Sequence, residues 1–261
     1  MSCRNQHAFR QMGVGLVELM VALVLSLFLL AGLFTIFFST KRSYNDQQAL
    51  SALQENQVLA ASVLADTVRA AGYFPYGTTY ASRSAAFPGN ATYGASVTWA
   101  AGQVVYATGT TASSSQNTLS VRLIPSVALN CLGSYANTPQ VNTFSVDGAG
   151  DLECSVNGAA AQPLVSPLGN LGTNTSGGGV QDMKVMIGVA SGGGVSIDRY
   201  YAPNSVPTAD WQNARNVTIR LTLFNPLFDS VNTPPGASID GQGQPRYLTM
   251  TRVIGLENLR Q

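Results

Sequence analysis

Charged side chains are scarce in this sequence. Asp, Glu, Lys and Arg make up 10% of its 261 residues, and the formal net charge is +1. Ordinary globular chains carry about 25% charged residues. Without a basic excess the chain has no field that attracts a polyanion, so we expect no nucleic-acid partner. The polar share consists instead of Ser, Thr, Asn, Gln and Gly, which favours an extracytoplasmic protein.

Histidine and catalytic motifs are nearly absent as well. The one histidine, His7, lies close to the N-terminus, so the rest of the chain has no imidazole base or metal ligand. No GxSxG, HExxH or GxxxxGK[ST] motif occurs. Asp147, Asp151 and Glu153 gather at one expected turn but lack the EF-hand spacing, which predicts a solvated turn rather than a calcium site. We expect no enzyme, no catalytic residue, no metal and no cofactor.

Cysteine and tryptophan are rare. Of the three cysteines, Cys3 lies in the basic segment 1–13, which leaves Cys131 and Cys154 for the rest of the chain. Two such cysteines predict one disulfide in an oxidising compartment, and two buried free thiols are the alternative. Trp99 and Trp211 are expected to pack in the core or at its rim rather than to form a ligand surface.

What the sequence does contain is a long apolar run near its N-terminus. No charged residue occurs from Leu19 to Phe38, and twenty helical residues span roughly 30 Å, the thickness of the hydrocarbon core of a bilayer. Glu18 precedes the run, and a carboxylate there is costly unless it reaches water or is paired. Segment 1–13 is basic like the start of a signal peptide, but the run is too long for an ordinary one. We therefore expect a transmembrane helix at about residues 16–38, and a plain signal anchor is the alternative reading of the same segment.

Residues 13–22 (GVGLVELMVA) resemble the class III signal of type IV prepilins. The resemblance implies a leader of residues 1–13, which a prepilin peptidase removes by cutting between Gly13 and Val14, and methylation of the new amino group of Val14. The family usually has Phe or Met at that position. Glu18 would then lie one helical turn from the new amine, and we expect it to attract the amine of a neighbouring subunit during assembly.

The helix is expected to continue beyond the apolar run. Residues 41–71 contain no proline or glycine and are rich in good helix formers. Their apolar residues recur at spacings of three, four or seven, which predicts an amphipathic helix packed on a sheet. A coiled-coil stalk is the alternative, but no heptad is sustained. We expect one helix over 14–71, amphipathic and periplasmic over 39–71, that ends before Gly72. The residues of the stripe are Leu50, Leu53, Ala60, Leu64, Val68 and Ala71.

The remainder, residues 72–261, is expected to be a β-rich globular domain. Short β-branched runs alternate with clusters of turn residues there. Residues 147–150 predict a hairpin, and 119–123 predict a half-buried strand with Arg122 outward. The expected strands are 97–101, 103–107, 119–123, 141–146, 152–156, 180–190, 196–201, 217–223 and 247–254, with loops at 108–117 and 170–179. The predicted fold class is α+β, a long N-terminal helix packed on one antiparallel sheet.

A second resemblance covers much of the chain. Several segments are similar, in the same order, to the PilW family of minor type IV pilins: 53–56 (LQEN), 69–74 (RAAGYF), 180–185 (VQDMKV), 187–189 (IGV), 198–200 (DRY), Trp211, 217–223 (VTIRLTL) and 246–260, which ends in LENLR. The resemblance implies a type IV pilin-like fold. It also implies a minor pilin that primes or supports pilus assembly in a tip or initiation complex and serves pilus-dependent motility or adhesion.

The resemblance further implies partners and places. The partners would be other minor and major pilins bound through their N-terminal helices, the prepilin peptidase, the inner-membrane assembly platform and a tip adhesin. The chain would cross the inner membrane once, with its C-terminal domain in the periplasm, and would reach the cell-surface pilus after assembly. Two alternatives stay open: a minor pseudopilin of a type II secretion system (GspJ-like), and a signal-anchored periplasmic binding or adhesive domain that keeps Met1.

Overall fold

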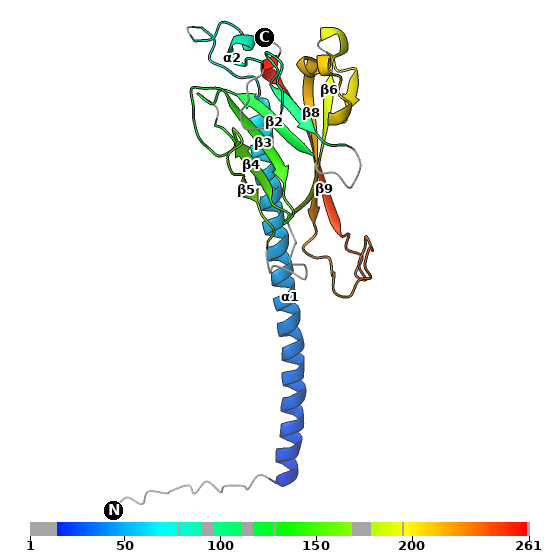
Figure 1. The fold of residues 1–261 in the computed structure, drawn as a ribbon. Helices are drawn as coiled ribbons and strands as arrows, with labels where there is room; N and C mark the ends of the chain where they lie inside the picture. Colours follow the sequence, from blue (N-terminus) through cyan, green and yellow to red (C-terminus); the bar gives the residue numbers. More distant parts are fainter. Residues whose placement is uncertain are drawn as a thin grey trace, which may run out of the picture. The chain divides into compact units, whose positions relative to one another are not determined.

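The fold is described from a computed structural model of the chain (Figure 1). The structure describes residues 15–77, 79–89, 97–110, 117–127, 129–168, 179–194 and 196–259. The chain forms two compact units, Met1–Asn45 and Asp46–Gln261. The expected α+β class is confirmed, with a long N-terminal helix and antiparallel sheets.

Helix α1 (Leu16–Arg69) is 54 residues long, which confirms the expected long helix to within two residues at each end. It ends in a turn at residues 70–72, where Gly72 has a φ of +79°, a conformation that glycine adopts without a steric penalty. The side chain of Asn258 also closes this end, because its Nδ2 donates to the carbonyls of Arg69 (3.0 Å) and Ala71 (3.3 Å). Backbone carbonyls that the helix leaves without partners are thereby satisfied.

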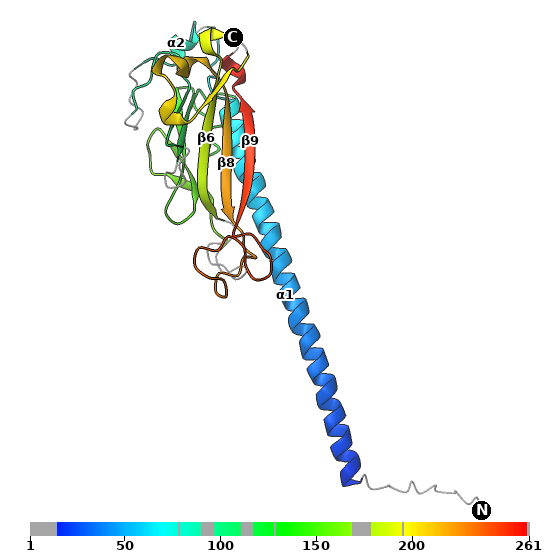
Figure 2. The same ribbon diagram turned by 90° about the vertical axis from the view of Figure 1, so that its right-hand side faces the viewer.

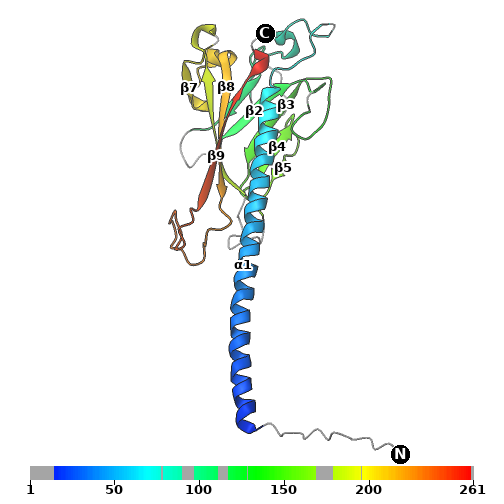
Figure 3. The ribbon, with the colours of Figure 1, turned by 180° about the vertical axis from the view of Figure 1, so that it is seen from behind.

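The part of α1 that belongs to the second unit has one buried face. Leu53, Ala60, Leu64 and Val68 are buried as expected and share one core cluster with strand residues of the domain. Leu50 is only partly buried, and its neighbour Ala49 is fully buried instead. This part of α1 is therefore packed on sheets, as predicted, and is not an isolated stalk. It lies behind β2–β5 in Figure 1 and in front of them in Figure 3, which views the chain from the other side.

The strands form two antiparallel sheets rather than the single sheet expected from the sequence. One sheet has the order β1-β2-β3-β4-β5 and the other β7-β6-β8-β9. Figure 2 shows β6, β8 and β9 side by side, with α1 next to β9. The alternation of apolar residues identifies a strand but carries no information about which strand it pairs with, so the number of sheets was not predictable from it. The strands are β1 (Val105–Thr108), β2 (Thr118–Leu123), β3 (Gln140–Val146), β4 (Leu152–Val156), β5 (Gln162–Val165), β6 (Val180–Val189), β7 (Arg199–Tyr201), β8 (Ala214–Phe224) and β9 (Tyr247–Gly255).

Two expected strands are corrected in the region before β2. The prediction of a strand at 97–101 is wrong: residues 97–100 have no regular structure and 101–102 form a turn. The Oε1 of Gln103 accepts a hydrogen bond from the amide of Ala100 (3.0 Å), and Gly102 has a φ of +75°. Both features favour a turn over a strand. The strand expected at 103–107 begins only at Val105.

Other elements are shorter than expected or were not predicted. The strand expected at 196–201 is reduced to β7, and β5 was not predicted because it contains Pro163, which is tolerated on an edge strand such as this one. Most of the expected loops 108–117 and 170–179 lie outside the described residues. The unpredicted helical turns are α2 (Arg83–Ala86), η1 (Ser191–Gly193), η2 (Pro203–Ser205), η3 (Thr208–Asn213) and η4 (Glu257–Leu259).

The hairpin between β3 and β4 is confirmed. One carboxylate oxygen of Asp147 accepts hydrogen bonds from the amides of Ala149 (2.9 Å) and Asp151 (2.7 Å). This is the local bonding by which aspartate stabilises turns. The Asp147 carboxylate therefore has a structural role within the turn.

Arg122 on β2 is the residue whose environment differs most from expectation. Its side chain is fully buried, although the alternation in 119–123 predicted an outward position. The guanidinium lies 5.3 Å from the ring centre of Phe87 and 5.1 Å from that of Trp99, and it donates to the carbonyls of Gln103 (3.2 Å) and Pro88 (3.0 Å). The segment before β1 covers the second face of β2, so this strand is buried on both sides.

Candidate functional site

The apolar half of α1 is the first candidate for a functional surface. Its large apolar side chains between Leu16 and Phe38 are 52–77% exposed. The segment is long and apolar enough to cross a membrane, judged by its length and composition alone, and a signal sequence meets the same criteria. A contiguous apolar surface of this size marks contact with lipid or with other protein surfaces.

The polar groups of this segment are suited to apolar surroundings. Its two hydroxyl side chains donate back to the helix, Ser26 to the carbonyl of Leu23 and Thr35 to that of Ala31, each at 2.8 Å. The hydroxyls therefore need no outside partner, which is the condition for placing them in lipid or in an apolar bundle. Glu18 is the one charged residue of the segment and lies in the first turn of α1, where the helix dipole favours a carboxylate.

The predicted processing site is only partly within the described chain. Gly13 and Val14, the residues of the expected cleavage and methylation, lie outside the described residues. Glu18 lies on α1 and is exposed. Cleavage after Gly13, methylation of Val14 and the pairing of Glu18 with an amine therefore stay predictions.

Cys131 and Cys154 form a disulfide, as the sequence predicts. Their Cα atoms are 6.4 Å apart and 23 residues separate them in the chain. Cys154 is fully buried on β4, opposite Phe144 on β3, and the amide of Cys131 donates to Oδ1 of Asn142 (2.9 Å). The bond attaches the segment before β3 to β4, between β3 and β5 of the first sheet.

Two exposed loops are organised by carboxylates. The amide of Ser191 donates to Asp198 (2.9 Å) and holds the pKa of that carboxyl below its usual value. The amide of Asp229 does the same for Asp240 (3.0 Å), whose pKa is also lowered. Hydrogen bonds to the charged form of a carboxylate favour that form. Within the described residues, no group of three or more His, Cys, Asp or Glu side chains is placed to hold a metal ion.

An aromatic cluster is the feature that sequence reasoning missed. Trp99, Tyr106 and Trp211 meet although about a hundred residues separate the first two from the third, and all three line one cavity. The sequence contains no local signal for this, because the contact depends on how the two sheets pack. Both tryptophans are buried in the core, as expected, and in addition they line this cavity.

Comparison with known proteins adds little to this picture. The sequence matches no family model and no curated protein. Among solved structures, the chain is similar to a type IV-like pilin from Thermus thermophilus, with 15% sequence identity, coverage of 79% of this chain and 98% of that chain, and a TM-score of 0.38. A similarity this low does not show a shared family.

Proposed function

We propose that this chain is a type IV pilin-like subunit, and more specifically a minor pilin of the PilW type. The observation that carries the proposal is the order of features along the N-terminal region. A prepilin-like motif at 13–22 overlaps the start of one continuous helix, which carries Glu18 in its first turn, continues through an exposed apolar segment and ends packed on a β-domain. A plain membrane anchor needs neither the carboxylate nor the continuity.

The proposed mechanism uses the apolar segment twice. After cleavage behind Gly13 the segment holds the chain in the inner membrane, with the β-domain in the periplasm. On assembly the same surface packs against the helices of other pilins. In an apolar bundle an unpaired carboxylate is costly, so Glu18 stabilises a register in which an amine of a neighbouring subunit lies beside it. The complex then primes the addition of major pilins.

The proposed partners follow from this mechanism. They are the prepilin peptidase, other minor and major pilins, the inner-membrane assembly platform and a tip adhesin. The proposed role in the cell is pilus-dependent motility or adhesion. The work of the chain is assembly and not catalysis.

The mature N-terminus is the decisive measurement for this proposal. Intact-mass analysis of the membrane-extracted chain should show the loss of residues 1–13 and the addition of one methyl group. Gly13→Leu should leave the precursor uncut, whereas the matched control Gly32→Leu, which changes a glycine with open space around it inside α1, should be processed normally. A chain that still begins at Met1, or normal maturation of Gly13→Leu, would show a signal-anchored domain instead.

The role of Glu18 is tested by a neutral variant of the same shape. Glu18→Gln should be processed but should not enter pili, because the amide does not attract an amine as a carboxylate does. Glu55→Gln, an exposed position further along α1, is the control and should enter pili normally. Pili and twitching should be lost when the gene is deleted. Loss of type II secretion with twitching retained would instead identify a pseudopilin.

A further inference from the structure

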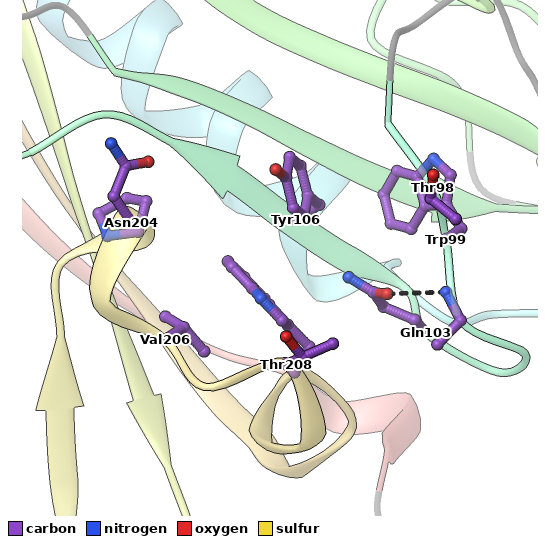
Figure 4. A pocket seen from close by; sticks show the side chains of 10 residues that line it. Thr98, Trp99, Gln103, Tyr106, Asn204, Val206 and Thr208 are labelled. Atoms are coloured by element: carbon purple, nitrogen blue, oxygen red, sulfur yellow. Dashed lines mark hydrogen bonds between the residues drawn. The ribbon is translucent and has the colours of Figure 1, made fainter.

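A cavity of about 530 Å³ lies between β1 and the η2–η3 segment that precedes β8. It is lined by residues from two stretches, 98–106 and 203–211, so it lies where the first sheet meets the connection between β7 and β8 of the second sheet. Its volume falls in the range of about 300–1,000 Å³ that is typical of small-molecule sites. Figure 4 shows the lining side chains converging from both stretches.

The two walls of the cavity are held together by hydrogen bonds at both ends. At one end the amide of Gly109 donates to Oδ1 of Asn204 (3.1 Å), and the amide of Asn204 donates to the carbonyl of Gly109 (3.2 Å). At the other end Nε2 of Gln212 donates to the carbonyl of Ala101 (3.3 Å). The cavity is therefore pre-formed, and a ligand would not have to order its walls.

Tyr106 is the central aromatic side chain of the cavity. Its ring centre lies 6.0 Å from that of Trp99 and 5.1 Å from that of Trp211. The two indoles are buried, with 1% and 7% of their surface exposed, while Tyr106 is only half-buried. Figure 4 shows Tyr106 between Trp99 and Asn204. The indoles thus fix the orientation of a phenol ring that is itself accessible from the cavity.

The polar side chains that line the cavity are uncharged, and hydrogen bonds fix the directions of two of them. The buried carboxamide of Gln103 is held by the amide of Ala100 and the carbonyl of Val105, both at 3.0 Å; the first of these bonds is dashed in Figure 4. Because Oδ1 of Asn204 is bound to Gly109, its Nδ2 has a fixed direction. Within the described chain neither this Nδ2 nor the hydroxyl of Tyr106 has a hydrogen-bond partner. No charged side chain is among the described residues that line the cavity.

We propose that this cavity binds a neutral saccharide. A pyranose ring has an apolar C–H face that can lie on the Tyr106 ring, and hydroxyls that can accept from Nδ2 of Asn204 and bond with the hydroxyl of Tyr106. The absence of lining cations disfavours phosphorylated or acidic ligands. A purely apolar ligand would displace water from the amide and hydroxyl groups and leave them without partners, which is costly. The site does not depend on assembly into a fibre.

The two tryptophans provide the assay. The chain contains Trp99 and Trp211 and no other tryptophan, and both line the cavity, so tryptophan emission reports directly on its occupancy. The purified full chain should be kept in a detergent without a sugar headgroup, because glycoside detergents would themselves compete. It is titrated with glucose, galactose, N-acetylglucosamine, lactose and cellobiose. At least one should change the emission saturably, and the open-chain polyol sorbitol should not.

Variants then connect the signal to the cavity. Asn204→Asp, which keeps the Oδ1 acceptor for the amide of Gly109 but removes the Nδ2 donor, and Tyr106→Phe each remove one ligand hydrogen bond and should raise the dissociation constant about fivefold, the usual effect of one such bond. Tyr106→Phe keeps the ring between the indoles and so keeps the fold. Tyr135→Ala, an exposed tyrosine outside the cavity lining, should bind as the original chain does. Any one of three results would overturn the proposal. The first is tryptophan emission that no saccharide changes, and the second is saccharide binding that neither cavity variant weakens. The third is saturation by a proline-rich peptide but by no saccharide.

Discussion

Removal of the Cys131–Cys154 disulfide should destabilise the domain by a predictable amount. The bond closes a loop with a sequence separation of 23. In the chain-entropy model, a loop of this length restricts the unfolded chain enough to stabilise the folded state by about 3 kcal/mol. Replacing both cysteines by alanine should therefore lower the free energy of unfolding by about that amount. For a domain of this size, the melting temperature should fall by roughly 6–12 °C.

The measurement is urea unfolding of the full chain in detergent, followed by tryptophan emission. The double alanine variant and the reduced original chain should share a lower unfolding midpoint, and reducing agent should have no further effect on the variant. In a chain that keeps residues 1–13, Cys3→Ala is the control, because Cys3 is not a member of the bond, and its midpoint should be unchanged. If the chain unfolds at the same urea concentration after alkylation has shown both thiols to be free, the loop-entropy reasoning is refuted.

Three further predictions test the packing of α1 and the order of one loop. Leu64→Ala removes a side chain that is only 2% exposed and should lower the free energy of unfolding by about 2–5 kcal/mol. The control Leu59→Ala, on the exposed side of α1, should lower it by less than about 1 kcal/mol. Equal effects of the two variants would contradict the packing described. Asn258→Ala removes the side-chain cap of α1 and should cost about 1 kcal/mol, measured as a lower melting temperature. The amide of Asp229 lowers the pKa of Asp240, so the charged carboxylate stabilises its loop above about pH 4, the ordinary value for aspartate, and that contribution is lost as the pH falls through the lowered pKa. The protection factors of the amides in this loop, which correct for the intrinsic pH dependence of hydrogen exchange, should fall only in acid in the original chain but already at pH 7 in Asp240→Asn; unchanged protection in the variant would contradict this role.

The sequence by itself determined the helix and most strands, because their signals are local. The absence of proline and glycine from residues 41–71, followed by Gly72, favours an uninterrupted helix that stops near that glycine, and α1 ends within three residues of it. The stripe through Leu53, Leu64 and Val68 likewise indicated which face of α1 would be buried. The alternation in 217–223 placed β8 for the same reason, since side chains in a strand point to opposite faces in turn.

The tertiary structure alone decided which of these elements meet. The division into two sheets depends on strand pairing, which no pattern within one strand encodes. Arg122 is buried because a separate segment covers β2 and supplies two carbonyls and two aromatic rings to its guanidinium. Tyr106 and Trp211 form one cavity only because β1 lies against the segment before β8. Local propensity acts over a few residues, whereas these contacts join residues that the folded chain brings together from far apart.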